Sequence, residues 1–200
     1  MATVWNPADK TVNITLSVGN HVATTTGSAG NEGVRAHSTY HGSSGKWYLE
    51  YTGITHAHTS RWGFADAGYT LGNSSGILGL DTSGDVNGGT PTPMTGVLGD
   101  PAGHTACFAM DFDNKRMWVR YDGGLWNGIV ASNPATNTGG IDISTGFTLP
   151  VTPYFYGQFT ADAGTLNCGD SAFVQAIPSG FTAWDSTPPV PPVSYGQVIC

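Results

Sequence analysis

Residues 107–128 read CFAMDFDNKRMWVRYDGGLWNG, and this stretch decides the predicted fold. The apolar run over residues 105–112 leads into the turn-forming triplet Asp113-Asn114-Lys115, and residues 116–121 then read RMWVRY. Side chains in the second run alternate, with Met117, Val119 and Tyr121 on one face and Arg116, Trp118 and Arg120 on the other. Two such runs around a short Asp/Asn turn predict a β-hairpin, which is an antiparallel element.

Short alternating runs bounded by Gly, Asn, Asp and Pro continue on both sides of this hairpin. No stretch shows sustained helical periodicity. Trp47, Trp62 and Phe108 lie in strand runs and are expected in the core. Residues 127–145 contain Pro134 and are predicted to lack regular structure. Further strands are predicted at residues 12–18, 21–25, 34–39, 45–53, 61–67, 75–80, 154–159 and 164–168, with 172–174 as an additional candidate.

The composition fits one all-β domain. The chain has 200 residues, of which 39% are hydrophobic and only 10% are charged, and it contains 29 glycines. Aromatic and β-branched residues are too plentiful for a disordered chain. Many short strands joined by tight turns have this composition. With seven Lys plus Arg and a net charge of −7, the chain has no basic stripe to neutralise phosphates, which excludes a nucleic-acid partner.

The chain also lacks membrane and secretion signals. Its longest apolar runs are far shorter than the ~20 residues of a membrane-spanning helix, which predicts no membrane insertion. The N-terminus reads MATVWNPADK and has no apolar signal-peptide core, so a cytoplasmic protein is expected unless it is released with a virus particle. The odd set of Cys107, Cys168 and Cys200 predicts two buried thiols and a terminal one, with a Cys107–Cys168 disulfide as the alternative.

Six segments, in order, resemble the SPRY family in the form found in phage and bacterial proteins. They are TVWNPADKTVNITLS, SSGKWYLEYTG, WGFADAGYTLG, CFAMDFDNKRMWVRYDGGLWNG, TPYFYGQFTADAGTLNCGD and IPSGFTAW, and the match covers roughly residues 4–184. The resemblance implies a concanavalin A-like jelly roll, a two-sheet antiparallel β-sandwich, over residues 1–185. It also implies a module without enzymatic activity or cofactor that binds partners through loops at one rim. Residues 186–200, with the run TPPVPPV, are expected to form an extended Pro-rich tail.

The residues themselves offer no catalytic or metal constellation. His56 and His58 could share a side of an extended segment with His37 and His41 nearby, but zinc needs further ligands with supporting contacts. Residues 81–85 supply two carboxylates and no Glu, which is poor for calcium. Glu32 and Glu50 are the only glutamates, and no strand carries the acid pair of a glycosidase. We therefore predict no catalytic residue, no metal and no cofactor.

Aromatic and arginine side chains near the turns are the candidate binding residues. Trp118 lies between two arginines on one strand face, which predicts an outward stacking platform. The alternative is that these aromatics cover a second layer on a sheet or an oligomer contact. The rim loops are expected at residues 69–75, 81–104 and 125–138. The candidate ligand-binding residues are Tyr69, Arg116, Trp118, Arg120, Trp126 and Asn127.

These observations lead to a functional hypothesis. The chain is expected to be a virion component, such as a tail fibre, spike or decoration protein, that recognises a protein or a host-surface glycan through its loops. The apolar residues of the tail would dock it on a larger assembly or on another copy. The alternative is a free bacterial adaptor of lectin-like or protein-binding type.

Overall fold

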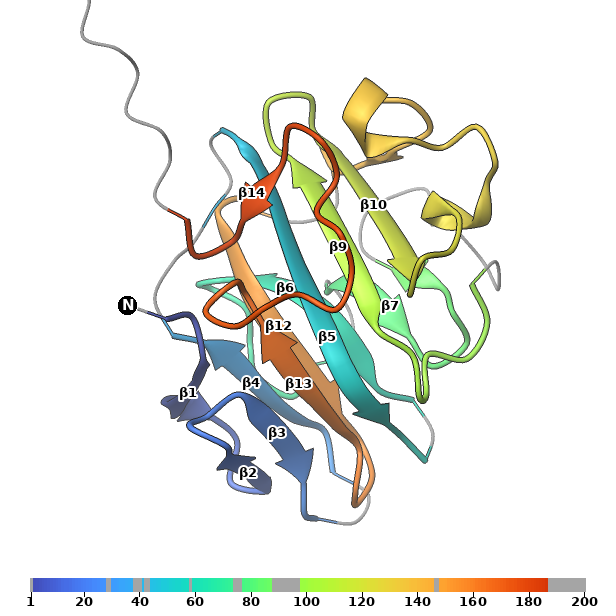
Figure 1. Cartoon of the computed structure of the whole chain (residues 1–200). Coiled ribbons are helices and arrows are strands. Elements are labelled where there is room, and N and C mark those ends of the chain that lie inside the picture. Colours follow the sequence, from blue (N-terminus) through green and yellow to red (C-terminus); the bar gives the residue numbers. More distant parts are fainter. Residues whose placement is uncertain are drawn as a thin grey trace, which may run out of the picture.

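The computed structural model describes residues 2–27, 30–37, 41, 44–57, 59–73, 77–87, 98–145 and 148–186. Its strands form two sheets packed face to face (Figure 1). Neighbouring strands are antiparallel except for β14 (Thr182–Ala183), which pairs in parallel with β5 (Lys46–Thr55). The predicted all-β sandwich is therefore confirmed.

The strand order places sequence-distant segments side by side. The six-stranded sheet has the order β1 (Trp5–Lys10), β4 (Glu32–Ala36), β12 (Val151–Gly157), β6 (Arg61–Asp66), β7 (Leu78–Asp81) and β8 (Val86–Asn87). The eight-stranded sheet has the order β11 (Ile141–Asp142), β10 (Arg116–Tyr121), β9 (Ala106–Asp111), β5, β13 (Ala163–Asn167), β3 (Val22–Thr25) and β2 (Ile14–Ser17), with β14 beside β5. Two short 3-10 helices, η1 (Trp126–Gly128) and η2 (Pro134–Thr136), lie between β10 and β11.

The predicted hairpin is present as β9 and β10, which pair in continuous register from Arg116 opposite Asp111 to Tyr121 opposite Ala106. Asp111 fixes its turn, because its carboxylate accepts hydrogen bonds from the Asn114 amide N–H at 3.0 Å and from Asn114 Nδ2 at 2.8 Å. Burial opposes ionisation of this carboxylate, yet the bonds from Asn114 and Lys46 hold the pKa of Asp111 below its usual range.

Several predicted boundaries differ from the structure. The strand expected at residues 12–18 is only Ile14–Ser17, because Val12 is exposed and Val18 belongs to a turn with φ +51°. Residues 172–174 form no strand. The prediction that residues 127–145 lack regular structure is wrong, because η2 and β11 lie there. Pro134 is compatible with η2 because it stands at the first turn, where its missing N–H leaves no hydrogen bond unmade.

The core between the sheets is rich in aromatic side chains. Trp47, Trp62 and Phe108 are buried in it, as predicted. Trp184, from the far end of the described chain, is fully buried with its ring 5.2 Å from that of Phe64. Beside it, the Thr3 amide N–H donates to the Asp185 carboxylate at 2.9 Å. The sandwich therefore uses the chain up to residue 185, and the expected tail lies outside the described residues from 187 onward.

The thiols of Cys107 and Cys168 are free and buried, as the first sequence interpretation expected, whereas Cys200 lies outside the described residues. Burial raises the pKa of Cys107 to about 11, which keeps this thiol protonated and unreactive at neutral pH. Among the described residues, no helix has the length and apolar character to cross a membrane.

His41 gives the fold a pH dependence. Its ring stacks on Trp47 at 3.9 Å and its Nε2 lies 3.0 Å from the Trp184 carbonyl oxygen. Burial lowers the pKa of His41 below its ordinary value of 6.5, against the opposing effect of that carbonyl. Because the unfolded chain then binds a proton more readily than the folded one, stability falls as the pH drops through 6.5 towards the lower folded-state pKa.

We expect His41→Gln, which keeps an N–H donor but cannot titrate, to reduce this pH dependence. Thermal unfolding followed by circular dichroism between about pH 7.5 and about pH 5.5 measures it, since histidine changes charge in this range. The variant should lose less thermal stability on acidification than the wild type. Equal losses in the two proteins would assign the pH dependence to other groups.

Candidate functional site

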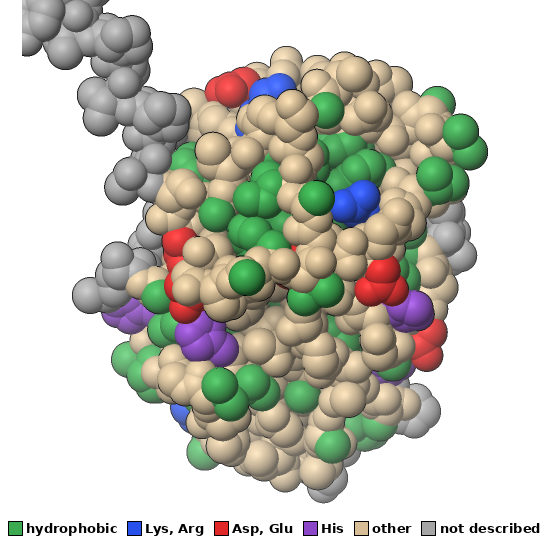
Figure 2. Space-filling model, viewed as in Figure 1, with side chains coloured by type: hydrophobic (Ala, Val, Ile, Leu, Met, Phe, Trp, Pro, Cys, Tyr) green, Lys and Arg blue, Asp and Glu red, His purple; other side chains and the backbone are tan. Residues whose placement is uncertain are grey.

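A second apolar layer lies on the outer face of the eight-stranded sheet. Tyr48, Cys107, Ala109 and Trp118 point outward from β5, β9 and β10, and Trp126 and Phe181 pack over them. Residues 169–181, which we call the crossing segment, run over this face between β13 and β14 (Figure 1). Space-filling Figure 2 shows hydrophobic side chains in the opening that this segment frames. The predicted alternative of a covered second layer is therefore present.

Glu50 fastens the crossing segment. The side chain is fully buried on the outer face, and its Oε1 accepts from the Tyr48 hydroxyl at 2.7 Å and from the Gln175 amide N–H at 2.8 Å. Its Oε2 accepts from the Val174 amide N–H at 2.8 Å. The carboxylate thus accepts from three donors, and the two backbone amides among them attach the crossing segment to β5.

Trp118 points away from the inter-sheet core, as the alternation predicts, but it is not an exposed platform. The indole is fully buried, its Nε1–H donates to the Thr138 carbonyl oxygen at 2.8 Å, and Phe181 meets its ring edge-on at 6.2 Å. The prediction of an outward stacking surface at Trp118 is wrong, because chain segments distant in sequence cover the ring.

The arginines beside Trp118 have other partners. Arg116 forms an ion pair with Asp142 at 3.2 Å. The Arg120 guanidinium lies 4.3 Å from the ring centre of Trp126, and its Nη2 donates to the Ala176 carbonyl oxygen at 3.4 Å. The cation–π pair of this region is therefore Arg120 on Trp126.

Asn127 positions the loop that carries Trp126. Its backbone has φ +52°, a conformation that asparagine tolerates better than most residues, and its side chain is buried. Oδ1 accepts from the Val119 amide N–H at 2.8 Å, and Nδ2 donates to the Gly139 carbonyl oxygen at 2.9 Å. The amide oxygen and nitrogen thus bond to β10 and to the β10–β11 connection, and together they fix the shape of this loop.

The same loop exposes three aliphatic side chains. Leu125 is 51% exposed, Ile129 49% and Val130 86%. Figure 2 shows hydrophobic side chains at the upper right edge of this face, where Figure 1 draws the β10–β11 connection in yellow. We call the set of Arg120, Leu125, Trp126, Ile129 and Val130 the η1 surface. The sequence predicted its loop and two of its members, but not the aliphatic ones.

Tyr69 lies elsewhere. It packs edge-on against Tyr154 at 5.1 Å, within a cluster on the outer face of the six-stranded sheet. Its hydroxyl donates to the Asn73 carbonyl oxygen, and burial raises the pKa of Tyr69 to about 12. The structure therefore brings five of the six predicted residues to one region and leaves Tyr69 on the opposite side of the sandwich.

Two histidines at one end of the sandwich are bound to aspartates. His56 Nε2 is 2.7 Å from Asp100 Oδ1, and His104 Nδ1 is 2.7 Å from Asp122 Oδ2. Bonds from backbone amides, and then from these imidazoles, hold the pKa values of both carboxyls below their usual range. Within the described part of the chain, no three His, Cys, Asp or Glu side chains come together as metal ligands, and His58 lies outside it.

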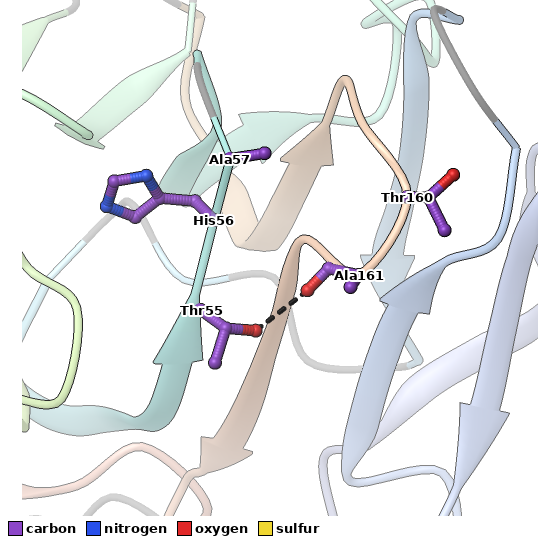
Figure 3. Close-up of a pocket in the computed structure, with 5 residues that line it drawn as sticks. All are labelled: Thr55, His56, Ala57, Thr160 and Ala161. Carbon is purple, nitrogen blue, oxygen red and sulfur yellow. Dashed lines mark hydrogen bonds between the residues drawn. The ribbon is translucent and has the colours of Figure 1, made fainter.

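A small pocket of about 220 Å³ lies between the end of β5 and the β12–β13 turn (Figure 3). Thr55, Ala57, Thr160 and Ala161 line it together with His56, whose ring points away from the turn in this view. The Thr55 hydroxyl already donates to the Ala161 carbonyl oxygen at 2.8 Å. The His56 ring is bound to Asp100, outside the lining, and we do not place the site in this pocket.

Comparison with known proteins supports the architecture. No family model and no curated protein matches the sequence. Among solved structures, the SPRY domain of human HERC1 is similar at a TM-score of 0.61 and 11% identity, over 84% of this chain and 99% of that one. The PSpry domain of TRIM65 is similar at a TM-score of 0.55 and 11% identity, over 84% of this chain and 92% of that one. The chain therefore has the fold of SPRY domains.

Proposed function

We propose that the chain is a non-enzymatic protein-binding module and that the η1 surface is its principal contact. The observation that carries this proposal is the exposure of Leu125, Ile129 and Val130 on the loop whose Trp126 pairs with Arg120. Exposed apolar groups that lie together commonly mark interaction sites, and arginine and tryptophan are enriched among residues that dominate binding energy. The SPRY fold is consistent with this role.

The acidic and thiol groups also support a role without catalysis. The Glu50 carboxylate is occupied by three donors, and the Glu32 carboxylate accepts from Asn13 Nδ2 at 2.7 Å. The Cys107 thiol is buried with a raised pKa. These groups serve the fold, and none is left poised for proton transfer or nucleophilic attack.

We further propose a partner on a virus particle or on a host surface, on the basis of the phage-type sequence resemblance. The alternative is a free adaptor, and a glycan partner would make either one lectin-like. Binding to purified particles or whole host cells, with a glycan array in parallel, separates these proposals. Binding to neither particles nor cells removes the virion proposal, and saturable sugar binding by the isolated chain favours the lectin-like one. Of the proposed rim loops, residues 74–75 and 88–97 lie outside the described part of the chain.

The η1 surface is tested by panning a random-peptide display library against the full chain. We expect the double substitution Ile129→Ser with Val130→Ser to weaken the enriched peptides by about tenfold or more, because hot-spot side chains carry most of the energy. Thermal stability should stay unchanged, since both side chains are exposed. The matched control is Val12→Ser. Val12 is as exposed as Val130, but it precedes β2, at the edge of the eight-stranded sheet opposite to β10 and β11. Unchanged affinity in the double variant would move the contact away from η1.

A further inference from the structure

A second pocket lies on the outer face of the eight-stranded sheet, at the N-terminal end of the crossing segment. Its volume is about 350 Å³, and its floor is formed by β5 and β13. One wall is the β2–β3 turn and the other is the start of the crossing segment. The residues that line it include Val18, His21, Thr52, Thr165, Ser171 and Val174.

Fixed contacts hold both walls in place. His21 Nε2 is 3.0 Å from Asp170 Oδ2, which joins the turn directly to the crossing segment. The other ring nitrogen of His21 is 3.2 Å from the Leu166 carbonyl oxygen of β13. Asn167 Nδ2 donates to the Ala172 carbonyl oxygen at 3.1 Å, which anchors the second wall to the floor. The pocket is therefore preformed, as ligand pockets usually are.

Val18 lies at the edge of the pocket and has a backbone conformation that is unfavourable for valine. Its φ is +51°, and β-branched side chains are genuine outliers in this region. The side chain is nevertheless 72% exposed, so it gains little from packing. Backbone strain of this kind clusters at binding sites. Val174, 60% exposed, lies across the pocket, so that two valines form apolar lips on opposite walls.

The floor is polar and uncharged. The hydroxyls of Thr52, Thr165 and Ser171 make no hydrogen bond to any described residue, and each can both donate and accept. None of the described residues that line the pocket is Lys, Arg, Asp or Glu. Figure 2 shows this part of the face, over β13 and β3, mainly in the tan of uncharged polar groups and backbone. A neutral ligand matches these groups, whereas a charged one would lose hydration without gaining an ion pair.

We propose that this pocket binds an extended, uncharged segment of a partner protein. The three hydroxyls pair with amide groups of the segment, and the two valines contact its aliphatic side chains. A sugar is the weaker candidate, because the described lining residues offer no Trp, Tyr or Phe ring on which a sugar could stack. This inference rests on the proposed protein-binding function and adds a second contact on the same outer face.

The test again uses a random-peptide display library panned against the full chain, with free neutral oligosaccharides as a second probe. We expect one class of enriched peptides to be uncharged and to lose about tenfold or more in affinity with Thr165→Val or Val18→Gly. The Ile129→Ser with Val130→Ser variant should leave this class unchanged. Thr15→Val and Val12→Gly are matched controls, because both residues are exposed and outside the pocket lining.

The thermal unfolding temperature of Val18→Gly distinguishes a binding role of Val18 from a structural one. Glycine accepts positive φ freely, so Val18→Gly should keep or raise the thermal unfolding temperature while it weakens binding. A residue that only stabilised the turn would not combine weaker peptide binding with unchanged or higher thermal stability when it is replaced. If the enriched peptides respond to the η1 variant and not to the pocket variants, this inference fails and the proposed function stands. If no peptide is enriched, both fail. Oligosaccharide binding that Thr165→Val abolishes would overturn the proposed occupant.

Discussion

Glu50→Ala is expected to lower the free energy of unfolding by about 3–5 kcal/mol, since leaving buried donors without a partner costs roughly 1–3 kcal/mol each. The substitution removes the acceptor of the Val174 and Gln175 amides and of the Tyr48 hydroxyl at a fully buried position. Hydrogen bonds to an ionised carboxylate are also stronger than neutral ones. Urea denaturation followed by tryptophan fluorescence measures the loss.

Glu50→Gln is the conservative comparison. It keeps one acceptor oxygen but turns an amide NH₂ group towards donors, so its loss should be intermediate. Hydrogen exchange should also quicken at the Val174 and Gln175 amides, because the crossing segment is released. A loss below about 1 kcal/mol for Glu50→Ala, the size of one ordinary hydrogen bond, would contradict the role of this carboxylate as the fastening point.

Trp118→Ala is expected to be destabilising to a similar degree, by about 3–5 kcal/mol, as for large-to-small substitutions in packed cores. The indole fills the layer between β10 and Phe181, and its removal also leaves the Thr138 carbonyl oxygen without its donor. If Trp118 were an exposed stacking platform, the same change would stay within about 0.5 kcal/mol.

Chemical denaturation of Trp118→Ala beside Ile129→Ala distinguishes these cases. Ile129 lies in the same region but is half exposed, so its truncation should have little effect on stability. Equal and small effects in both variants would mean that the layer over Trp118 contributes little to the folded state.

Local patterns were enough to predict the sandwich and its central strands. β10 begins and ends at the predicted residues, because its alternation and its flanking turns are both strong. β1 shows no alternation and contains Pro7, which an edge strand tolerates because one side of it has no ladder to complete. β14 has only two residues and pairs in parallel with a strand more than a hundred positions earlier, and no local signal can reveal such a pairing.

The candidate site was harder to predict for the same reason. Alternation correctly placed Trp118 on the outer face, but burial there depends on Phe181 and the crossing segment, which arrive from far along the chain. The Arg120–Trp126 pair and the exposed aliphatic residues follow from the shape of one loop, which Asn127 fixes through bonds to β10 and Gly139. The pocket beside Val18 forms only where the β2–β3 turn meets the crossing segment, which lies far away in sequence. Sequence indicates which loops matter, whereas three-dimensional contacts decide which side chains they present.

The bond between Thr3 and Asp185 brings the two ends of the sandwich within hydrogen-bonding distance of each other. A unit built in this way can be carried as an insert within a surface loop of another protein, because entry and exit lie at one point and no strand has to stretch. It also suits circular permutation. A short linker would join the region of Asp185 to that of Thr3, and new termini would be made at the exposed Asn137. Every strand pairing of the two sheets would stay intact.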